Sequence, residues 1–362
     1  MRMLRNAALT LLLVAYATST SAQSNDRLER AIAALRAHAD TSGVAGLAAA
    51  IHVGGERAWS GGFGWSDLEQ RVPMSDSTVS RIGSISKSVA SIATMILVDR
   101  GRIDLDAPIS TYLPDYPKPQ ADRMTMRQVM SHTAGIRHYN GDEFASAIHY
   151  DDVFTPLRVF ASDSLLFEPG SDYSYSTYGY TVVSAVTERT DGRAWTRLMQ
   201  EEVFDPLGLR SMQPDWRDSL IANRAAFYDR TRDGGWLNTT PVDNSNKWAG
   251  GGLVSDVRDV AAFGQAIADG RLLSADARTE MWTKQTPEGE SSYGLGWAVG
   301  EIAGHRAISH SGGSMGATAM LIILPDDGIV VAVLGNTGGV GHGGIAGRVA
   351  RILLGVETTS AD

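Results

Sequence analysis

The chain contains no cysteine, and only four of its 32 basic residues are lysine. Without cysteine it cannot form disulfides, use thiol catalysis or bind metals through thiolates. Acidic residues outnumber basic ones to give a net charge of −9, and no basic cluster stands out, so nucleic acid is not an expected partner. No apolar run reaches the about 20 residues that a membrane-spanning helix needs. These absences favour an acidic globular protein.

The first 22 residues have the pattern of a secretory signal peptide. Two arginines supply positive charge, residues 7–17 are apolar, and residues 20–22 are small enough for signal cleavage. An N-terminal anchor helix is the alternative interpretation. Cleavage near residue 22 would leave residues 23–362, which suits one enzyme domain with two lobes. The pattern predicts a periplasmic or secreted protein without stable membrane insertion.

Strand-like patterns lie near both ends of the chain. After an amphipathic helix over residues 26–39, residues 44–53 and 59–65 predict a hairpin. Toward the C-terminus we predict strands at residues 293–299, 306–310, 317–324 and 329–334, and helices at residues 254–267 and 343–354. Strands at both ends imply that the two ends of the chain share one sheet.

The middle of the chain has mostly helical spacing. Residues 84–98 are apolar almost all round, as expected of a helix buried between two lobes. Helical spacing continues over residues 125–205, where proline and glycine interrupt it. We therefore predict a mostly helical lobe at about residues 111–249, inserted into a sheet lobe formed by about residues 23–110 and 250–362.

Ser84 and Lys87 lie three residues apart at the start of the apolar helix. Positions i and i+3 share one helix face, so the hydroxyl and the amine converge. Burial and the positive end of the helix dipole both disfavour the ammonium form of Lys87, and a neutral amine can accept the proton of a serine nucleophile. Arginine cannot do this, because it stays protonated in proteins. The pair indicates a serine hydrolase, but a Ser-x-x-Lys sequence alone also arises by chance.

Two further segments carry candidate groups. Tyr175 lies in a hydroxyl-rich loop before an apolar helix, and it could shuttle a proton if nearby cations lowered its pKa from about 10. The segment His310–Gly313 ends one predicted strand and precedes another, and its glycines would let the backbone approach a ligand closely. Its amides could join the Ser84 amide in an oxyanion hole. The alternatives are an aromatic loop packed on the core and a glycine-rich hairpin.

Residues 312–316 offer a competing nucleophile. They match Gly-x-Ser-x-Gly around Ser314, and Asp326 and His342 follow in the order of an α/β-hydrolase triad. That motif requires a helix directly after the serine, whereas residues 317–324 predict a strand. The competing site is therefore disfavoured.

Histidines do not form a metal-binding pattern in this sequence. His132, His138 and His149 lack the i, i+4 pairing of a metalloprotease site. His132 is more simply explained by a structural role. No metal is expected.

Three elements follow one another in a fixed order: Ser84-x-x-Lys87, then Tyr175, then His310-Ser311-Gly312. This order resembles the serine β-lactamase-like and penicillin-binding serine hydrolases, specifically their class C branch, in which the elements read Ser-x-x-Lys, Tyr-x-Asn and Lys/His-Thr/Ser-Gly. Supporting segments are residues 126–136, 135–139, 175–180, 247–252 and 293–297. Several of them are most similar to the animal mitochondrial serine β-lactamase-like proteins and their bacterial relatives. The resemblance covers nearly all of residues 23–362.

The resemblance implies an α+β fold, with an antiparallel sheet flanked by helices, an inserted mostly helical lobe, and the site in the cleft between them. It implies that Ser84 is the nucleophile of an acyl-enzyme mechanism and that Lys87 and Tyr175 transfer protons. His310 would orient the tyrosine, and the amides of Ser84 and Gly313 would hold the oxyanion. The other expected substrate-binding residues are Thr177, Ser311, Gly312 and Lys247. No cofactor or metal is needed.

Two positions depart from the β-lactamase pattern. Thr177 stands where β-lactamases usually carry Asn, which removes an amide that contacts the substrate. His310 replaces Lys, which leaves less positive charge for the carboxylate of a β-lactam or a peptide C-terminus. Both changes favour an exported hydrolase of peptides or esters. The alternatives are a penicillin-recognising D,D-peptidase or weak β-lactamase, and a non-catalytic binding or scaffold protein of the same fold. The sequence does not predict an oligomeric state.

Overall fold

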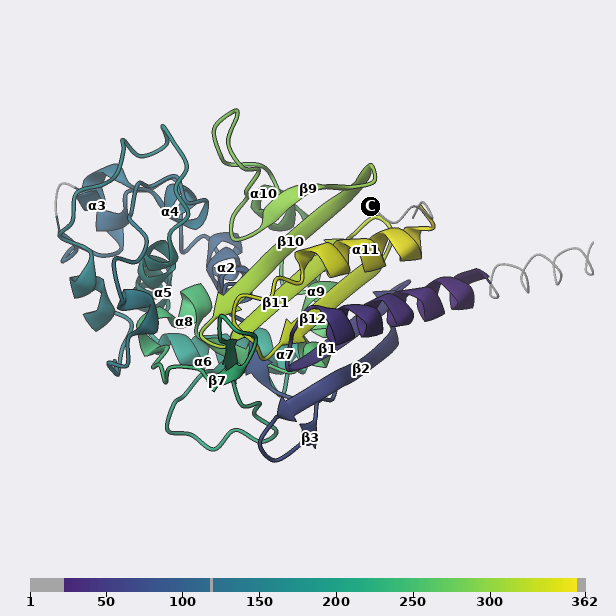
Figure 1. The fold of residues 1–362 in the computed structure, drawn as a ribbon. Coiled ribbons are helices and arrows are strands. Elements are labelled where there is room, and N and C mark those ends of the chain that lie inside the picture. Colours follow the sequence, from purple (N-terminus) through teal and green to yellow (C-terminus); the bar gives the residue numbers. More distant parts are fainter. Residues whose placement is uncertain (1–22, 118–119, 357–362) are drawn as a thin grey trace, which may run out of the picture.

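The computed structural model describes residues 23–117 and 120–356, and Figure 1 shows their fold. Residues 1–22, which carry the predicted signal peptide, lie outside these ranges. Within them, no helix combines the length and apolar character needed to cross a membrane. A sheet lies at the centre of the structure and helices pack on both of its faces (Figure 1).

Seven antiparallel strands form the central sheet, in the order β3-β2-β1-β12-β11-β10-β9. They are β1 (Gly46–Val53), β2 (Glu56–Asp67), β3 (Val72–Pro73), β9 (Ala298–Ile302), β10 (His305–Ser314), β11 (Ala317–Leu324) and β12 (Ile329–Gly335). β1 pairs directly with β12, with Leu47 opposite Gly335. The prediction that both ends of the chain share one sheet is confirmed.

The central strands of this sheet are buried on both faces. In β1, Ala48 and Ala50 belong to one core cluster, whereas Leu47 and Ile51 belong to a second cluster on the opposite face. Successive side chains of a strand point to opposite faces, so a strand covered on both sides needs apolar residues at every position. This requirement explains the uninterrupted apolar runs at the two ends of the sequence.

Helices cover the two faces of the sheet (Figure 1). The N-terminal helix (residues 23–41) and α11 (Gly343–Leu354) pack on one face. On the other face lie α2 (Ile85–Asp99) and α9 (Val257–Ala268), which contact β10 and β12 respectively. The α+β class with an antiparallel sheet flanked by helices is thus confirmed.

The middle of the chain adds short helices and two small sheets. The helices are α3 (Gln120–Arg123), α4 (Met126–Met130), α5 (Thr177–Asp191), α6 (Trp195–Met199), α7 (Asp205–Leu207), α8 (Trp248–Gly251) and α10 (Ala275–Met281). One small sheet contains β4 (Ser80–Arg81), β8 (Leu253–Ser255) and β5 (Gln213–Pro214), and the other contains β6 (Tyr228–Arg230) and β7 (Trp236–Asn238). α5 and α8 both contact α2. The predicted division at residues 111–249 stays a prediction.

The helical spacing of the sequence predicts more helix in this middle segment than the structure contains. Residues 131–176 contain only two 3-10 turns, Glu143–Ala145 and Thr155–Val159. Residues 254–267 also fail to form a single helix, because the first of them belong to β8. The carboxylate of Asp256 then caps α9 by accepting a backbone N–H of its first turn at 2.9 Å.

The strand predicted at residues 293–299 is also wrong in most of its length. Gly296 has a φ of 85°, which turns the chain, and β9 begins only at Ala298. By contrast, β10 extends beyond its prediction as far as Ser314. A two-residue turn at positions 315–316 then leads into β11. Because a strand and not a helix follows Ser314, the Gly-x-Ser-x-Gly sequence is no nucleophile elbow.

Candidate active site

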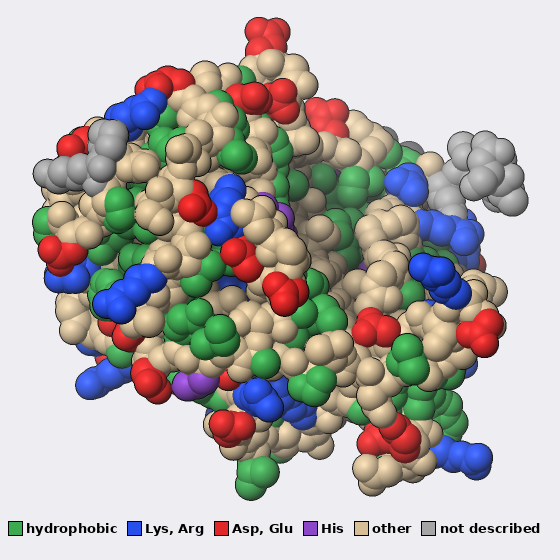
Figure 2. Space-filling model, turned by 60° about the vertical axis from the view of Figure 1, so that its left-hand side comes forward, with side chains coloured by type: hydrophobic (Ala, Val, Ile, Leu, Met, Phe, Trp, Pro, Cys, Tyr) green, Lys and Arg blue, Asp and Glu red, His purple; other side chains and the backbone are tan. Residues whose placement is uncertain are grey.

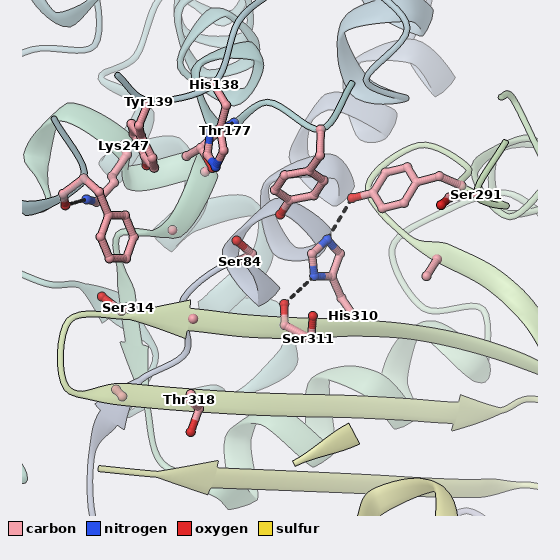
Figure 3. Close-up of a pocket in the computed structure, with 18 of the residues that line it drawn as sticks. Ser84, His138, Tyr139, Thr177, Lys247, Ser291, His310, Ser311, Ser314 and Thr318 are labelled. Carbon is pink, nitrogen blue, oxygen red and sulfur yellow. Dashed lines mark hydrogen bonds between the residues drawn. The ribbon is translucent and has the colours of Figure 1, made fainter. Parts of the chain in front are cut away.

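A cavity of about 600 Å³ opens beside the start of α2 and the strand β10 (Figure 3). Seven of the nine residues predicted for the site line it: Ser84, Tyr175, Thr177, Lys247, His310, Ser311 and Gly313. The other two lie behind the wall of the cavity. Lys87 is fully buried, and a side chain at Gly312 would collide with the backbone of Ile82. Four separate segments of the chain thus converge on one cavity.

Ser84 and Lys87 lie as their spacing predicts. Ser84 immediately precedes α2, and Lys87 is in the first turn of that helix. The Nζ atom of Lys87 lies 3.0 Å from Ser84 Oγ and 3.1 Å from Thr177 Oγ1, and it donates a hydrogen bond to the Gly250 carbonyl. These three oxygens fix the amine beside the serine hydroxyl.

The charge of Lys87 depends on its burial. Among the described residues, no carboxylate forms an ion pair with it. Burial lowers the pKa of Lys87 well below its usual value, and the positive charge of Lys247 lowers it further. An amine with a lowered pKa is available in its neutral form, which can accept a proton from Ser84.

Tyr175 packs beside this pair. The Nζ atom of Lys87 lies 4.8 Å from the centre of its ring. Burial raises the pKa of Tyr175, and a hydrogen bond with Ser84 lowers it only in part. The condition set from the sequence, that cations lower this pKa, is therefore not met. Tyr175 is a protonated phenol at neutral pH, so it can relay or donate a proton but does not start as a phenolate base.

His310 makes two hydrogen bonds that define its tautomer. Its Nδ1 lies 2.6 Å from the Ser311 carbonyl, which can only accept, so Nδ1 carries the proton. Its Nε2 lies 2.8 Å from Tyr293 Oη and accepts the phenol proton. Burial lowers the pKa of His310 to about 3, with a further contribution from Lys87. His310 is thus neutral, and its partner is Tyr293 and not Tyr175 as the sequence suggested.

The backbones of α2 and β10 meet beside Ser84. A Cβ atom on Gly83 would lie 2.6 Å from the Gly313 nitrogen, so only glycine permits this approach. Gly83 also has a φ of 51°, which favours glycine. The N–H groups of the first turn of a helix have no partner within the helix. The contact therefore places the predicted oxyanion donors, the Ser84 and Gly313 amides, on adjoining segments.

Two histidines outside the predicted site, His132 and His138, hold the start of α5. The Nδ1 atoms of His132 and His138 accept hydrogen bonds from the amides of Ser176 and Thr177, each at 3.2 Å. The buried His132 ring also lies 4.3 Å from the ring of Tyr175. These contacts join residues far apart in the sequence, so neither composition nor local spacing indicates them.

Comparison with known proteins agrees with this geometry. The family model described as Beta-lactamase matches residues 28–354. The chain belongs to the beta-lactamase family. Its members are serine hydrolases, and the present chain is accordingly an enzyme of the beta-lactamase-related serine hydrolase class.

Several members of the beta-lactamase family align with most of this chain. The human mitochondrial serine beta-lactamase-like protein LACTB is 28% identical over 421 residues, covering 86% of this chain and 77% of LACTB. A D-aminopeptidase of Cereibacter sphaeroides is 28% identical over 342 residues, covering 91% of this chain and 63% of the peptidase. A solved structure of a D-amino acid amidase from Ochrobactrum anthropi has a TM-score of 0.79 at 23% identity, covering 91% of this chain and all of the amidase, which shows the fold alone.

The competing α/β-hydrolase triad is not assembled in this beta-lactamase fold. Asp326 pairs with Arg306 at the surface. His342 contacts Thr318 Oγ1 at 3.0 Å and His38 at 3.3 Å, on the face covered by α11. Among the described residues there is also no group of three side chains that could hold a metal ion.

Proposed function

We propose that this enzyme is an exported serine hydrolase that cleaves peptides or esters through an acyl-enzyme, with Ser84 as its nucleophile. The observation that carries the proposal is the 3.0 Å approach of Lys87 Nζ to Ser84 Oγ at the wall of the cavity. A non-catalytic binding protein would not require a buried amine beside a serine hydroxyl, because burying an amine without an ion-pair partner lowers stability.

Acylation begins when Ser84 Oγ attacks the substrate carbonyl and its proton passes to neutral Lys87. The carbonyl oxygen becomes an oxyanion, held by the amides of Ser84 and Gly313. Collapse of this intermediate breaks the bond to the leaving group, which receives the proton through the phenol of Tyr175. The acyl group remains on Ser84. Water then attacks the acyl-enzyme by the same proton route, releasing the acid and restoring the serine hydroxyl.

Two features of the cavity favour peptides or esters over β-lactams. Thr177 Oγ1 contacts Lys87 where an amide side chain would contact a β-lactam. His310, which stands at the position of a charged lysine in β-lactamases, is neutral and bound to Tyr293. The relatives named D-aminopeptidase and D-amino acid amidase make peptides and amides the first substrates to test.

Covalent labelling of residues 23–362 with a fluorophosphonate tests the proposal. Intact-mass analysis should find a single adduct in the wild type and in Ser314→Ala, and none in Ser84→Ala. Labelling of Ser84→Ala but not of Ser314→Ala would make Ser314 the nucleophile and overturn the proposal. No adduct on the wild type would favour the non-catalytic binding protein. Labelling with a fluorescent penicillin would instead indicate the penicillin-recognising alternative.

A further inference from the structure

Lys247 is a buried cation at the wall of the active-site cavity, and the mechanism above does not use it. The residue is only 3% exposed and is among those that line the cavity. It belongs to the 3-10 turn Ser245–Lys247, immediately before α8. Its Nζ donates one hydrogen bond, to the Phe144 carbonyl at 2.8 Å, and lies 5.2 Å and 4.9 Å from the ring centres of Tyr139 and Phe144.

The two carboxylates whose charge acts on Lys247, those of Asp215 and Asp243, already have other partners. Asp215 pairs with Arg81 and with Arg224, and Asp243 pairs with His149 at 2.9 Å. Neither forms an ion pair with Lys247 in the described part of the chain. An ammonium group has three N–H donors, and burying it without a negative partner is costly. The hydrogen bond to the Phe144 carbonyl uses one of the three donors, and the Tyr139 and Phe144 rings lie beside the ammonium.

The surroundings of Lys247 offer hydrogen-bond donors for an anion. His138 also lines the cavity, and its Nδ1 accepts the Thr177 amide, so the proton of its neutral ring is on Nε2 and can be donated. Among the described residues lining the cavity there is no aspartate, glutamate or arginine. Lys247 therefore supplies the fixed charge of this cavity.

The position of this charge differs from its position in the β-lactamase pattern. Figure 3 shows His310 and Ser291 on one side of Ser84, and Lys247, His138 and Tyr139 on the other side. His310 is neutral, so the side on which the family pattern expects a lysine has no cation. The positive charge lies across the cavity instead.

The face of the molecule drawn in Figure 2 does not offer an alternative source of charge recognition. Figure 2 shows acidic and basic side chains interspersed over this face, and neither sign forms a continuous patch. Exposed, scattered charges are screened by salt and contribute little to binding. A buried ammonium in the wall of the cavity is screened much less.

We propose that Lys247 binds a carboxylate of the substrate, so that this enzyme prefers acyl compounds carrying a free carboxylate on the Lys247 side of Ser84. The inference rests on the proposed hydrolase function and names its substrate class. Substrates with an ammonium group at this position are rejected, because they would place two cations together in a low-dielectric cavity. Carboxylates gain a charge-assisted hydrogen bond there.

Matched ester pairs test this preference. We would measure kcat/KM at pH 7 for the mono-p-nitrophenyl esters of adipic and suberic acid, and for p-nitrophenyl hexanoate and octanoate, which differ from them only in lacking the terminal carboxylate. The readout is the ratio of anionic to neutral ester at each chain length. Because a change in the base Lys87 affects both esters equally, the ratio isolates recognition of the carboxylate.

The ratio should fall about tenfold or more in Lys247→Gln at one chain length or both. Lys247→Arg, which keeps the charge, should restore it, and the exposed Lys284→Gln should leave it as in the wild type. The wild-type ratio should also fall as the pH rises from 7 to 9.5, since burial lowers the pKa of Lys247 to about 8. Lys247→Arg should show no such fall.

Binding to the Ser84→Ala protein separates the inference from the proposed function. Calorimetry with the adipate and suberate monoesters needs no turnover, and their affinity should fall about tenfold when Lys247→Gln is added. Equal ratios and equal affinities with and without Lys247 would overturn the inference even if the wild type hydrolyses every ester. Failure of the wild type to hydrolyse any ester or to label with fluorophosphonate would refute the hydrolase, while the calorimetry still decides the role of Lys247.

Discussion

Two of the four lysines are buried at the active site, one in the first turn of α2 and one in the turn before α8. Both amines lie near two aromatic rings, but Lys87 also contacts three oxygen atoms, whereas Lys247 contacts one carbonyl oxygen. Burial lowers the pKa of both, but that of Lys247 only to about 8 and that of Lys87 well below its usual value. The same residue type therefore serves in two protonation states within one cavity, neutral as a base and charged as a binding group.

The difference teaches that burial alone does not decide the charge of a lysine. Burial and the charge of Arg81 lower the pKa of Lys247, but Asp215 and Asp243 raise it. Lys87 has no carboxylate of this kind, and the charge of Lys247 lowers its pKa further. Lys247 thus influences the protonation state of Lys87. Substitutions that treat the two positions identically should give different results.

The largest effect is expected from changing each lysine to arginine. Lys87→Arg should lower kcat/KM by about 10³-fold or more, because arginine cannot become the neutral base. Lys247→Arg keeps the charge that its site requires and should lose less than about tenfold. Steady-state kinetics with p-nitrophenyl hexanoate compares the two, with Lys284→Arg as the surface control. Equal losses at both positions would contradict the assignment of different protonation states.

A backbone change near Lys87, the substitution Gly83→Ala, should lower kcat/KM nearly as much without altering any charge. Gly83→Ala would place its Cβ 2.6 Å from the Gly313 nitrogen at a φ of 51°, and so separate the predicted oxyanion donors. We expect kcat/KM to fall about 10²-fold. Gly101→Ala is the matched control, since Gly101 has a φ of 66° but no atom within 4 Å of an added Cβ. It should cost about 1 kcal/mol of stability and leave kcat/KM intact. Loss of activity in both variants would show that backbone strain, and not separation of the oxyanion donors, lowers kcat/KM.

Removing the cation of Lys247 should stabilise the fold. The folded-state pKa of about 8 lies below the unfolded value, so the energetic cost of the buried charge is fully present below pH 8 and disappears as the pH rises towards 10.5. Lys247→Met should therefore raise the free energy of unfolding by about 3 kcal/mol at most at pH 7, and by little at pH 10.5. Urea unfolding at both pH values measures this, with Lys284→Met as control. A gain that is equal at both pH values would show that the charge is not its cause.

The smallest effect is expected on the pH dependence of catalysis. Activity requires neutral Lys87, so kcat/KM rises as the pH passes the folded pKa of this residue. Lys247→Gln removes a positive charge that lowers that pKa, and the acidic limb should move to higher pH by less than about one unit. A pH–rate profile on a neutral ester detects the shift. An unmoved or downward-shifted limb would mean that the two lysines are not coupled.

Sequence analysis predicted best those features that depend on short-range spacing. Apolar runs identified β11, β12 and α11, and the i, i+3 spacing identified the approach of Lys87 to Ser84. The strand predicted over residues 293–299 failed because the turn at Gly296 is determined by tertiary packing. A Cβ there would collide with Ser91 of α2, a contact that the local sequence does not reveal.

The contacts that the sequence missed are long-range ones between side chains. The partner of His310 is Tyr293, and the ring of His132 packs against Tyr175. Each pair joins different segments of the chain, so no periodicity links its members. Lys247 was expected in the cleft, but its remaining hydrogen-bond capacity emerges only when its neighbours and their existing partners are known.

The direct pairing of β1 with β12 also affects how the chain can fold. These strands stand at the centre of the sheet but come from opposite ends of the sequence, as the pairing of Leu47 with Gly335 shows. The hairpin of β1 and β2 can form early, yet one side of β1 has no partner until nearly the whole chain has been synthesised. Such a high contact order implies slow folding and an exposed apolar strand edge in the nascent chain. Assembly of the complete sheet is thus a late event, because it waits for the C-terminal strands.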